Sequence, residues 1–384
     1  MKKITLVFIL LVLYSCSSNP KLINENKENF YIEKPRIDYK LNSLPKDINV
    51  IYFSEEGEEL ILPDHIKGLL SNHYFYVNQI NYFPRVKLIN LSKDKSCRDA
   101  NTKNSFTIIF NLMHSPENNT QFNNCLKRIS DSRLFYVSSH KSKLTPNSGN
   151  QLIVDRNKDK YSLLNTLKKN SNSSVIIVDN LTVNDKEEIA KYLDKLEIRT
   201  THKASFTQKE SSQQLFNNIL LLNQSAKRKR KLSRVISEEV AYQKRPRNDV
   251  TALILSASLE EARNLKPAFE YTYGNSLPVY FINSWQTNLN YSKIEKDLEG
   301  AFIVDMPYML DLILPKEIPN IDNRTRGFAI GYDSYEILML LNGVNNLKGI
   351  EYKGLTGSIF FEQGKVNRIP SVFQIKNGKY KSAN

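Results

Sequence analysis

Cysteine and histidine can act as nucleophiles, general bases or metal ligands. In this sequence their spacing matches no known catalytic or metal-binding motif. The three cysteines are Cys16, Cys97 and Cys125. A nucleophilic thiolate needs a histidine poised beside it, and zinc motifs such as HExxH need ligands at fixed short spacings. The glycines form neither a P-loop nor a nucleophile elbow. We therefore expect no catalytic residue, no metal site, no cofactor and no enzyme activity. The five histidines, which form no such motif, are His65, His73, His114, His140 and His202.

The amino end predicts export and lipid attachment. Lys2 and Lys3 precede the apolar run Ile4–Leu13, which is too short to span a bilayer stably. The next residues, ending in Ser15 and Cys16, resemble a bacterial lipobox. We therefore expect residues 1–15 to be a signal peptide, and Cys16 to carry a diacylglyceryl thioether and an acylated amine. The alternative is an ordinary cleaved signal with an incidental cysteine.

Lipid attachment and charge indicate where the protein works. Two or three acyl chains anchor a protein stably, whereas one holds it only marginally. Ser17 rather than Asp follows Cys16, which by analogy with lipoprotein sorting favours the outer membrane, facing the periplasm. Loss of Lys2 and Lys3 with the signal lowers the net charge from +14 to +12. Because no nucleic acid is expected in the periplasm, this charge points to lipid headgroups, cell-wall material such as peptidoglycan, or an acidic partner.

Cys97 and Cys125 are an even pair in an oxidising compartment, which predicts a disulfide. The bridge would close a loop of about 29 residues around a predicted strand, Phe106–Phe110, and contribute roughly 3–4 kcal/mol through loop entropy. The alternative is two unpaired buried thiols.

The rest of the chain divides into a tether and a globular body. Residues 16–47 are rich in Asn, Lys, Glu and Pro and have no apolar period, so we expect a lipidated tether. As a random coil it would span roughly 30 Å, and fully extended at most ~100 Å. The remaining residues, 48–384, are expected to form one domain of two lobes.

Short apolar strands alternate with amphipathic helices along this body. Helices are expected over Asn184–Leu196, over Ser212–Ile236, and over Ser258–Tyr273, where Ser258 and Glu261 form a capping box. The alternation predicts the α/β class, with parallel sheets covered by helices on both faces, in a two-lobed architecture of the type I periplasmic-binding-protein kind. The expected strands are Ile48–Phe53, Val86–Leu91, Phe106–Phe110, Leu134–Val137, Gln151–Val154, Val175–Asp179, Val250–Ser256, Pro278–Ile282 and Ala301–Asp305.

The carboxyl-terminal strands differ from the others in being short and closely spaced. They are Gly357–Phe361, Lys365–Arg368 and Val372–Lys376, with glycine turns at Gly364 and Gly378. We expect an antiparallel appendage at the end of the α/β body.

A ligand in such a fold would contact residues at the carboxyl ends of the strands. A solute receptor would need serine hydroxyls and an aspartate converging there, whereas a cleft plugged by Tyr308 or Phe281 would favour a protein without a ligand. The candidate residues of this interlobe cleft are Ser138, Ser139, Asp179, Ser256, Ser284, Asp305 and Tyr308.

Two further segments are rich in charged residues. The run Lys227–Lys231 is either a solvated basic helix face or a docking strip for an acidic partner or anionic headgroups. The segment Arg245–Asp249 is expected to be structural, with Arg245 or Arg247 pairing with Asp249 or Asp333.

The carboxyl-terminal half carries six ordered blocks that are similar to one known family. Their order and spacing resemble the C-terminal domain of the penicillin-binding protein activators, the LpoA/LppC outer-membrane lipoproteins. The resemblance is specific over about Leu215–Gly378 and weaker over Ile48–Gln214. The blocks are Asn223–Val250, Leu253–Pro267, Leu277–Trp285, Leu298–Leu310, Arg326–Leu341 and Gly354–Gly378.

The resemblance implies a type I periplasmic-binding-protein-like fold and a regulatory function. Such lipoproteins reach from the outer membrane to a bifunctional class A penicillin-binding protein and stimulate peptidoglycan synthesis without being catalysts. Long family members carry a helical repeat domain before this one, whereas residues 17–47 are expected here to be only a short tether. The resemblance places no interface residue on this sequence.

Three functions stay open from the sequence. The first is a non-enzymatic regulator of cell-wall synthesis, the second a solute-binding lipoprotein that captures a small polar, amino-acid-like molecule for a transporter, and the third a structural envelope tether. Convergence of the strand-end side chains would distinguish the second from the first.

Overall fold

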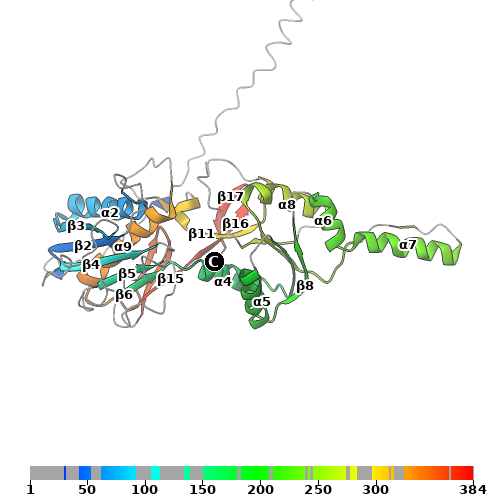
Figure 1. Ribbon diagram of the computed structural model, residues 1–384, viewed down its shortest axis with the longest axis horizontal. Helices are drawn as coiled ribbons and strands as arrows, with labels where there is room; N and C mark the ends of the chain where they lie inside the picture. Colours follow the sequence, from blue (N-terminus) through cyan, green and yellow to red (C-terminus); the bar gives the residue numbers. More distant parts are fainter. Residues whose placement is uncertain are drawn as a thin grey trace, which may run out of the picture. The chain divides into compact units, whose positions relative to one another are not determined.

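A five-stranded parallel sheet and a seven-stranded, mainly parallel sheet organise the described part of the chain (Figure 1). The first packs on one hydrophobic core, and the second lies between two. Every helix and strand described here except β1 belongs to one compact unit, Tyr31–Asn384. Cys16, Cys97 and Cys125 lie outside the described residues, so the lipid and the disulfide stay predictions. The computed structural model describes residues 30–31, 43–52, 62–91, 105–112, 134–138, 150–179, 183–206, 211–237, 241–242, 245–273, 277–282, 296–310, 313–314, 324–362 and 365–383.

The first sheet has five parallel strands in the order β3-β2-β4-β5-β6. Its central strands are buried along almost their whole length, which explains their continuous apolar runs. The helix α2 (Asp64–Ile80) connects β2 to β3 across one face. The strands are β2 (Asp47–Tyr52), β3 (Arg85–Asn90), β4 (Ser105–Asn111), β5 (Leu134–Ser138) and β6 (Asn150–Ile153).

The second sheet has seven strands in the order β17-β16-β11-β10-β9-β7-β8. Five are parallel, whereas β16 is antiparallel to β11 and β17 to β16. The strands are β7 (Ser174–Asp179), β8 (Arg199–Ser205), β9 (Ala252–Ser256), β10 (Val279–Phe281), β11 (Phe302–Asp305), β16 (Ser371–Lys376) and β17 (Lys379–Ser382).

Helices cover both faces of this second sheet, because successive strand residues point to opposite sides. In β7, Val175 packs with α4 (Arg156–Lys169) and α5 (Val183–Lys195), whereas Ile176 packs with α6 (Ser212–Ile219) and α8 (Leu259–Tyr273). The predicted capping box opens α8: the backbone N–H of Ser258 donates to Glu261 Oε2 at 2.8 Å, and the backbone N–H of Glu261 donates to Ser258 Oγ at 3.3 Å.

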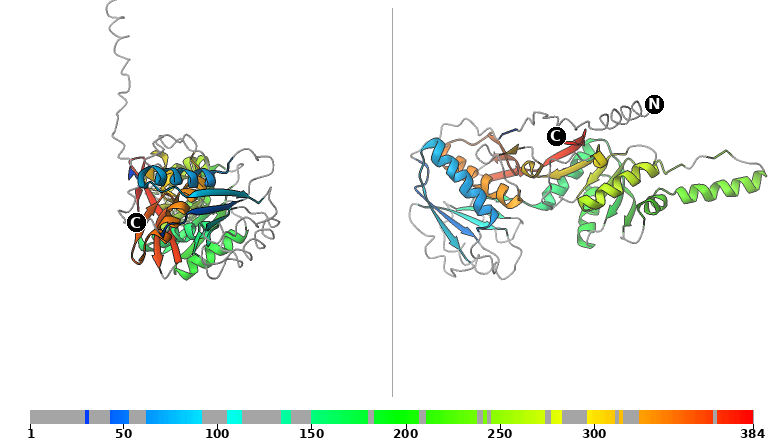
Figure 2. Two further views of the ribbon diagram at one scale, coloured as in Figure 1. Left: turned by 90° about the vertical axis from the view of Figure 1, so that its left-hand side faces the viewer. Right: turned by 90° about the horizontal axis from the view of Figure 1, so that it is seen from above.

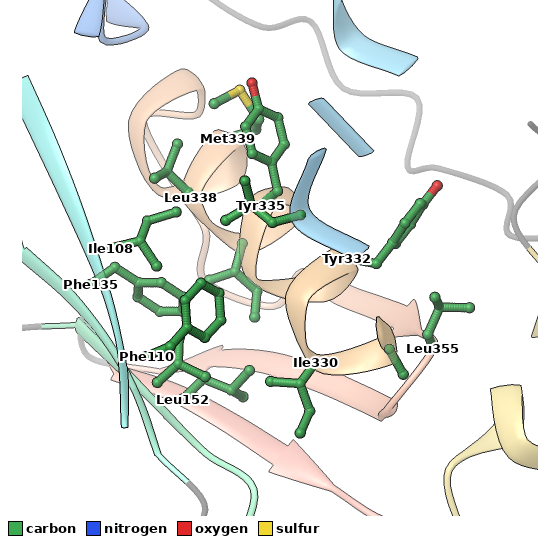
Figure 3. Packing of buried hydrophobic residues seen from close by; sticks show 14 of the residues in the cluster. Ile108, Phe110, Phe135, Leu152, Ile330, Tyr332, Tyr335, Leu338, Met339 and Leu355 are labelled. Atoms are coloured by element: carbon green, nitrogen blue, oxygen red, sulfur yellow. The ribbon is translucent and has the colours of Figure 1, made fainter. Parts of the chain in front are cut away.

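The core of the first lobe is built around α9 (Arg326–Gly343), which is buried along most of its length. Its side chains pack against the first sheet, as Figure 3 shows for Ile330 and Leu338 near Phe110 and Phe135. Helices α2 and α9 lie side by side (Figure 2). The close approach relies on Gly331, where an added Cβ would lie 1.8 Å from the carbonyl oxygen of His65.

The carboxyl-terminal strands do not form a single appendage. Three of them, β13 (Glu351–Gly354), β14 (Gly357–Glu362) and β15 (Lys365–Ile369), make a separate antiparallel sheet that packs into the first core. Strands β16 and β17 instead extend the second sheet, so the expectation of one appendage at the end of the body is wrong. The remaining described elements are β1 (Phe30–Tyr31), β12 (Ile313–Leu314) and the 3₁₀ helices η4 (Lys296–Leu298) and η5 (Pro307–Leu310).

Among the described elements, the chain passes from one sheet to the other after β6, after β11 and after β15. Met306 separates β11 from η5, and Pro370 separates β15 from β16. Each lobe is therefore assembled from segments distant in sequence. This confirms the predicted two-lobed α/β class with parallel sheets.

The expected helix Ser212–Ile236 is two helices. The first, α6, ends at Ile219, and α7 (Leu222–Ile236) begins after Leu221, which adopts the left-handed conformation with φ of 61°. Within the described part of the chain, no helix has the length and apolar character needed to cross a membrane.

Candidate functional site

The predicted cleft residues lie at strand ends, as expected, but they do not form one cluster. Ser138 ends β5 in the first sheet, whereas Asp179, Ser256 and Asp305 end β7, β9 and β11 in the second. Tyr308 lies in η5, and Ser139 and Ser284 fall outside the described residues. The four strand-end positions therefore contribute to at least two separate groups of contacts.

The first group is built around Asp179. In the register of the sheet, Asp179 lies opposite Ser256 of β9 and Ser205 of β8. Lys186 of α5 places its Nζ 2.8 Å from Asp179 Oδ1, an ion-pair contact without an aligned hydrogen bond, and 3.1 Å from Ser205 Oγ. Ser256 Oγ is buried and has no hydrogen-bond partner among the described residues. This group offers a carboxylate, an ammonium and a hydroxyl at one sheet edge.

The second group links Asp305 to α9 of the other lobe. Arg326 donates from Nε to Asp305 Oδ1 at 3.1 Å and from Nη2 to Oδ2 at 2.5 Å. The backbone N–H of Met306 donates to the same Oδ1 at 2.8 Å. Burial raises the pKa of the Asp305 carboxyl, and the Arg326 guanidinium opposes that rise. Asp305 is therefore held by its own chain across the lobe boundary.

A second ion pair joins the lobes at Arg368 of β15, whose side chain is 1% exposed. Its Nη1 donates to Asp159 Oδ1 of α4 at 2.8 Å, and its Nε donates to the carbonyl oxygen of Thr356 at 2.8 Å. Sequence reasoning did not single out this pair, because the two residues are 209 positions apart and have no local motif.

Tyr308 and Phe281 are core residues of different lobes. Tyr308 is fully buried, stacks on Phe328 at a centroid distance of 5.4 Å, and lies 5.7 Å from the Cζ of Arg324. Burial raises the pKa of the Tyr308 hydroxyl above its usual value, so it stays protonated. Phe281 is buried in the core of the second lobe. Both aromatic rings therefore fill protein interior.

Asp333 of α9 is fully buried and holds a turn. It accepts hydrogen bonds from the backbone N–H of Leu355 at 2.9 Å, from the backbone N–H and the hydroxyl of Thr356 at 2.8 and 2.6 Å, and from the Tyr352 hydroxyl at 3.1 Å. Burial raises its pKa to about 6, and these donors oppose the rise. Of the pairings expected for the arginine segment, Arg247–Asp249 is confirmed, with both hydrogen bonds at 2.7 Å.

Histidine has a structural role in α2. His65 packs against Tyr52 and Phe110, with ring centroids 6.2 and 4.9 Å away, and its Nε2 is buried with no hydrogen-bond partner among the described residues. Burial lowers its pKa to about 4, so the ring is neutral at physiological pH. The described residues contain no cluster of histidine, cysteine and acidic side chains suited to a metal ion.

One family model matches the chain, over residues 194–378, and its description is LppC putative lipoprotein. No curated protein matches the sequence.

Solved structures share the fold at low sequence identity. Full-length LpoA from Haemophilus influenzae is 14% identical, with a TM-score of 0.58 over 88% of this chain, and the matched region spans 59% of that protein. The LpoA (YraM) C-domain from the same organism, described as a regulator of PBP1A, is 13% identical, with a TM-score of 0.55 over 88% of this chain and 99% of that one.

A transport protein is equally similar in fold. A putative branched-chain amino acid ABC transporter from Rhodospirillum rubrum is 11% identical, with a TM-score of 0.57 over 88% of this chain and all of that one. The fold is thus the type I periplasmic-binding-protein-like fold that the sequence predicts. At these identities the structural likeness establishes the fold alone.

Proposed function

Because residues 194–378 match the family of LppC putative lipoproteins, we propose that this protein is a non-enzymatic outer-membrane lipoprotein that binds and activates a class A penicillin-binding protein. It would thereby regulate peptidoglycan synthesis from the periplasmic side. The family match carries this proposal. The fold shared with the H. influenzae C-domain, a regulator of PBP1A, supports it.

The charges at the lobe boundary also support a regulator. Solute receptors close by hinge motion around a ligand, which requires lobes that can move apart and together. Here Arg326–Asp305 and Arg368–Asp159 join the lobes directly, and three of these four side chains are at most 15% exposed. These four boundary charges are therefore neutralised by each other rather than left free for a charged solute, which favours a receptor that presents a surface to a protein.

A regulator of this kind acts by preferential binding. If the lipoprotein binds the active conformation of the synthase more tightly than the inactive one, it shifts the population toward the active conformation. We propose attachment through acyl chains on Cys16, with residues 16–47 as the tether and residues 48–384 as the receptor. The Cys97–Cys125 disulfide belongs to the same proposal, since it requires an oxidising compartment.

The test combines partner capture with an activity assay. The full lipoprotein, solubilised in detergent, is used to capture its partner from envelope extracts, and glycan polymerisation by the recovered synthase is measured with and without the lipoprotein. We expect a faster rate with the wild-type protein and with Cys16→Ala, which loses membrane attachment but keeps the receptor. An unchanged polymerisation rate contradicts the proposal, and membrane association of Cys16→Ala in cells contradicts the lipid anchor.

Solute capture is the second candidate, and the group around Asp179 favours it. Asp179 and Lys186 form an ion pair that could hold the amine and the carboxylate of an amino acid, and Ser256 Oγ lies buried beside them without a described hydrogen-bond partner. Isothermal titration with a panel of amino acids tests this idea, with Asp179→Asn as the matched variant. Saturable binding that Asp179→Asn abolishes would support solute capture, and the absence of heat from every amino acid would eliminate it for this class.

A further inference from the structure

Helix α7 combines an uninterrupted basic run with exposed apolar residues. Its sequence contains six lysines and arginines, Lys227–Lys231 and Arg234, and no acidic residue. Five of the six cations are exposed, while Lys229 is half-buried with its Nζ 5.4 Å from the ring centroid of Tyr242. Such a density of one charge sign produces a strong local positive potential.

Leu222, Leu232 and Ile236 of α7 follow one stripe, which is buried at its start and exposed at its end. Val235 lies beside this stripe, about 60° around the helix from Leu232. At 100° per residue, Leu222, Leu232 and Ile236 fall on the same side of the helix, opposite Lys227 and Lys231. Leu222 packs into the second lobe. By contrast, the side chains of the last turn lie in solvent: Leu232 and Ile236 are each 51% exposed, and Val235 is 81% exposed.

We propose that the carboxyl-terminal turn of α7 inserts into an anionic phospholipid surface. In this arrangement Leu232, Val235 and Ile236 enter the boundary between headgroups and acyl chains, and the neighbouring cations contact lipid phosphates. Interfacial helices have this pattern of apolar residues beside lysine and arginine. Long cationic side chains can cover apolar surface while their charged ends reach the headgroups. Each cation near an anionic membrane adds attraction of ~1 kcal/mol.

The length of the exposed stripe favours a lipid surface over a protein groove. A helix that docks in a groove uses apolar anchors at i, i+3, i+4 and i+7, over about two turns. The exposed apolar residues of α7 occupy only positions 232–236, and the earlier part of the stripe is already buried against the second lobe. A membrane interface requires no longer face than this, since a single turn can insert beside its cations.

This inference is independent of activation of a synthase. It concerns a membrane contact within the folded body, in addition to the lipid proposed at Cys16. A protein with two linked membrane contacts binds more tightly than a protein with either contact alone. Once the first contact has formed, it holds the second close to the same membrane. Binding through α7 would also set the orientation of the second lobe toward the membrane that the tether reaches.

Vesicle co-sedimentation tests the proposal. The mature chain, residues 16–384 with Cys16→Ala and therefore without signal peptide or acyl chains, is mixed with vesicles of phosphatidylcholine alone or of phosphatidylcholine with phosphatidylglycerol in equal amounts. We expect binding to the anionic vesicles only, and we expect it to weaken as salt is raised from about 0.05 to 0.5 M, because salt screens exposed charges.

In the same background, Lys227→Glu/Lys231→Glu/Arg234→Glu should weaken binding by about 100-fold or more. Leu232→Ser/Val235→Ser/Ile236→Ser should weaken it by roughly 10-fold or more.

Matched variants elsewhere separate α7 from general charge and hydrophobicity. Lys353→Glu/Lys365→Glu/Lys376→Glu makes the same charge change at exposed positions of β13, β15 and β16, and Tyr271→Ser removes a side chain that is 79% exposed on α8. Both controls should bind anionic vesicles within about 3-fold of the parent. Circular dichroism checks that each variant stays folded. The proposal is overturned if the parent does not bind anionic vesicles, if the control variants lose binding as α7 variants do, or if α7 binds an acidic protein but no vesicle.

Discussion

At the scale of single residues, the two buried carboxylates of α9, Glu336 and Asp333, hold neighbouring elements in place. Glu336 of α9 is fully buried and accepts hydrogen bonds from the Tyr76 hydroxyl at 2.6 Å and from Asn72 Nδ2 at 3.3 Å, both on α2. Asp333, one turn earlier, anchors the turn between β13 and β14. A buried carboxylate with several donors is stable without water, and these contacts account for each group without a catalytic role.

We predict that Asp333→Asn lowers the free energy of unfolding by about 1–3 kcal/mol at pH 7. The carboxylate accepts from four donors, whereas the amide would present an NH₂ group to the Thr356 N–H or to the Leu355 N–H. Urea denaturation of the two proteins measures the loss. Thr356→Ser is the control, since it keeps the hydroxyl and the backbone donor and should lose less than 1 kcal/mol.

The raised pKa of Asp333 predicts that the free energy of unfolding depends on pH in a definite direction. Its pKa is about 6 in the folded protein, above the ordinary value of 3.8, so the folded state binds the proton more tightly than the unfolded state. The stabilisation from this group is full below pH 4 and is lost as the pH rises through 6, a change of about 3 kcal/mol. The advantage of the wild type over Asp333→Asn should therefore shrink from pH 4 to pH 7. Parallel pH profiles of the two proteins would contradict the assignment.

At the scale of elements, the sequence predicted those strands whose apolar runs are continuous. The buried strands β4, β5, β7 and β9 were located within one or two residues, because no other element competes for a short apolar run between turn signals. The edge strand β8 was not predicted. Its residues are polar and mostly exposed, so its sequence contains no apolar run that would indicate a strand.

Helix boundaries were harder to predict from local pattern. The first-lobe helix α9 is apolar on nearly all sides and shows no helical stripe, because it is surrounded by protein. The break between α6 and α7 was missed because it falls at Leu220 and Leu221, and neither residue is a glycine or proline that would signal a turn. Tertiary packing, rather than local propensity, determines both features.

The crossing of α2 and α9 leads to a prediction about Gly331. Gly331→Ala places a Cβ 1.8 Å from the carbonyl oxygen of His65, so the two helix backbones must separate. We expect a loss of about 3 kcal/mol or more, since overpacking against backbone outweighs the helix-propensity gain of ~1 kcal/mol. Thermal denaturation measures this loss.

Gly327→Ala is the matched control on the same helix. The nearest atoms to its added Cβ would be the Asp64 Cβ at 3.3 Å and the His65 backbone nitrogen at 3.4 Å, which are close to ordinary van der Waals contact. We expect a change within about 1 kcal/mol. Equal destabilisation by the two alanines would refute the packing explanation for Gly331.

At the scale of the whole molecule, the sequence predicted strand-end chemistry but not the pairing across the lobes. Asp305 was singled out as a ligand-binding candidate, yet its partner Arg326 lies 21 residues later on a helix of the other lobe. Arg368 and Asp159 are farther apart still. Such pairs depend on how the chain crossings bring the lobes together, and a local motif contains no information about that arrangement.

The last prediction concerns how strongly these ion pairs couple the lobes. In a double-mutant cycle with Arg368→Ala and Asp159→Ala, we expect a coupling energy of about 2 kcal/mol or more. The reason is that the Arg368 side chain is 1% exposed, so removing Asp159 leaves a buried positive charge without a counter-charge. The exposed pair Lys67–Asp64, at 48% and 40% exposure, serves as the control and should give less than 1 kcal/mol.

The measurement is urea denaturation of the four proteins in each cycle, with hydrogen exchange recorded for α4 and β15. A strong coupling predicts that either Arg368→Ala or Asp159→Ala raises exchange in both elements, although they belong to different lobes. If the coupling energy at Arg368–Asp159 is no larger than at Lys67–Asp64, the lobes are not held together by this pair. Of the two ion pairs between the lobes described above, only Arg326–Asp305 would then join them, and solute capture would gain support.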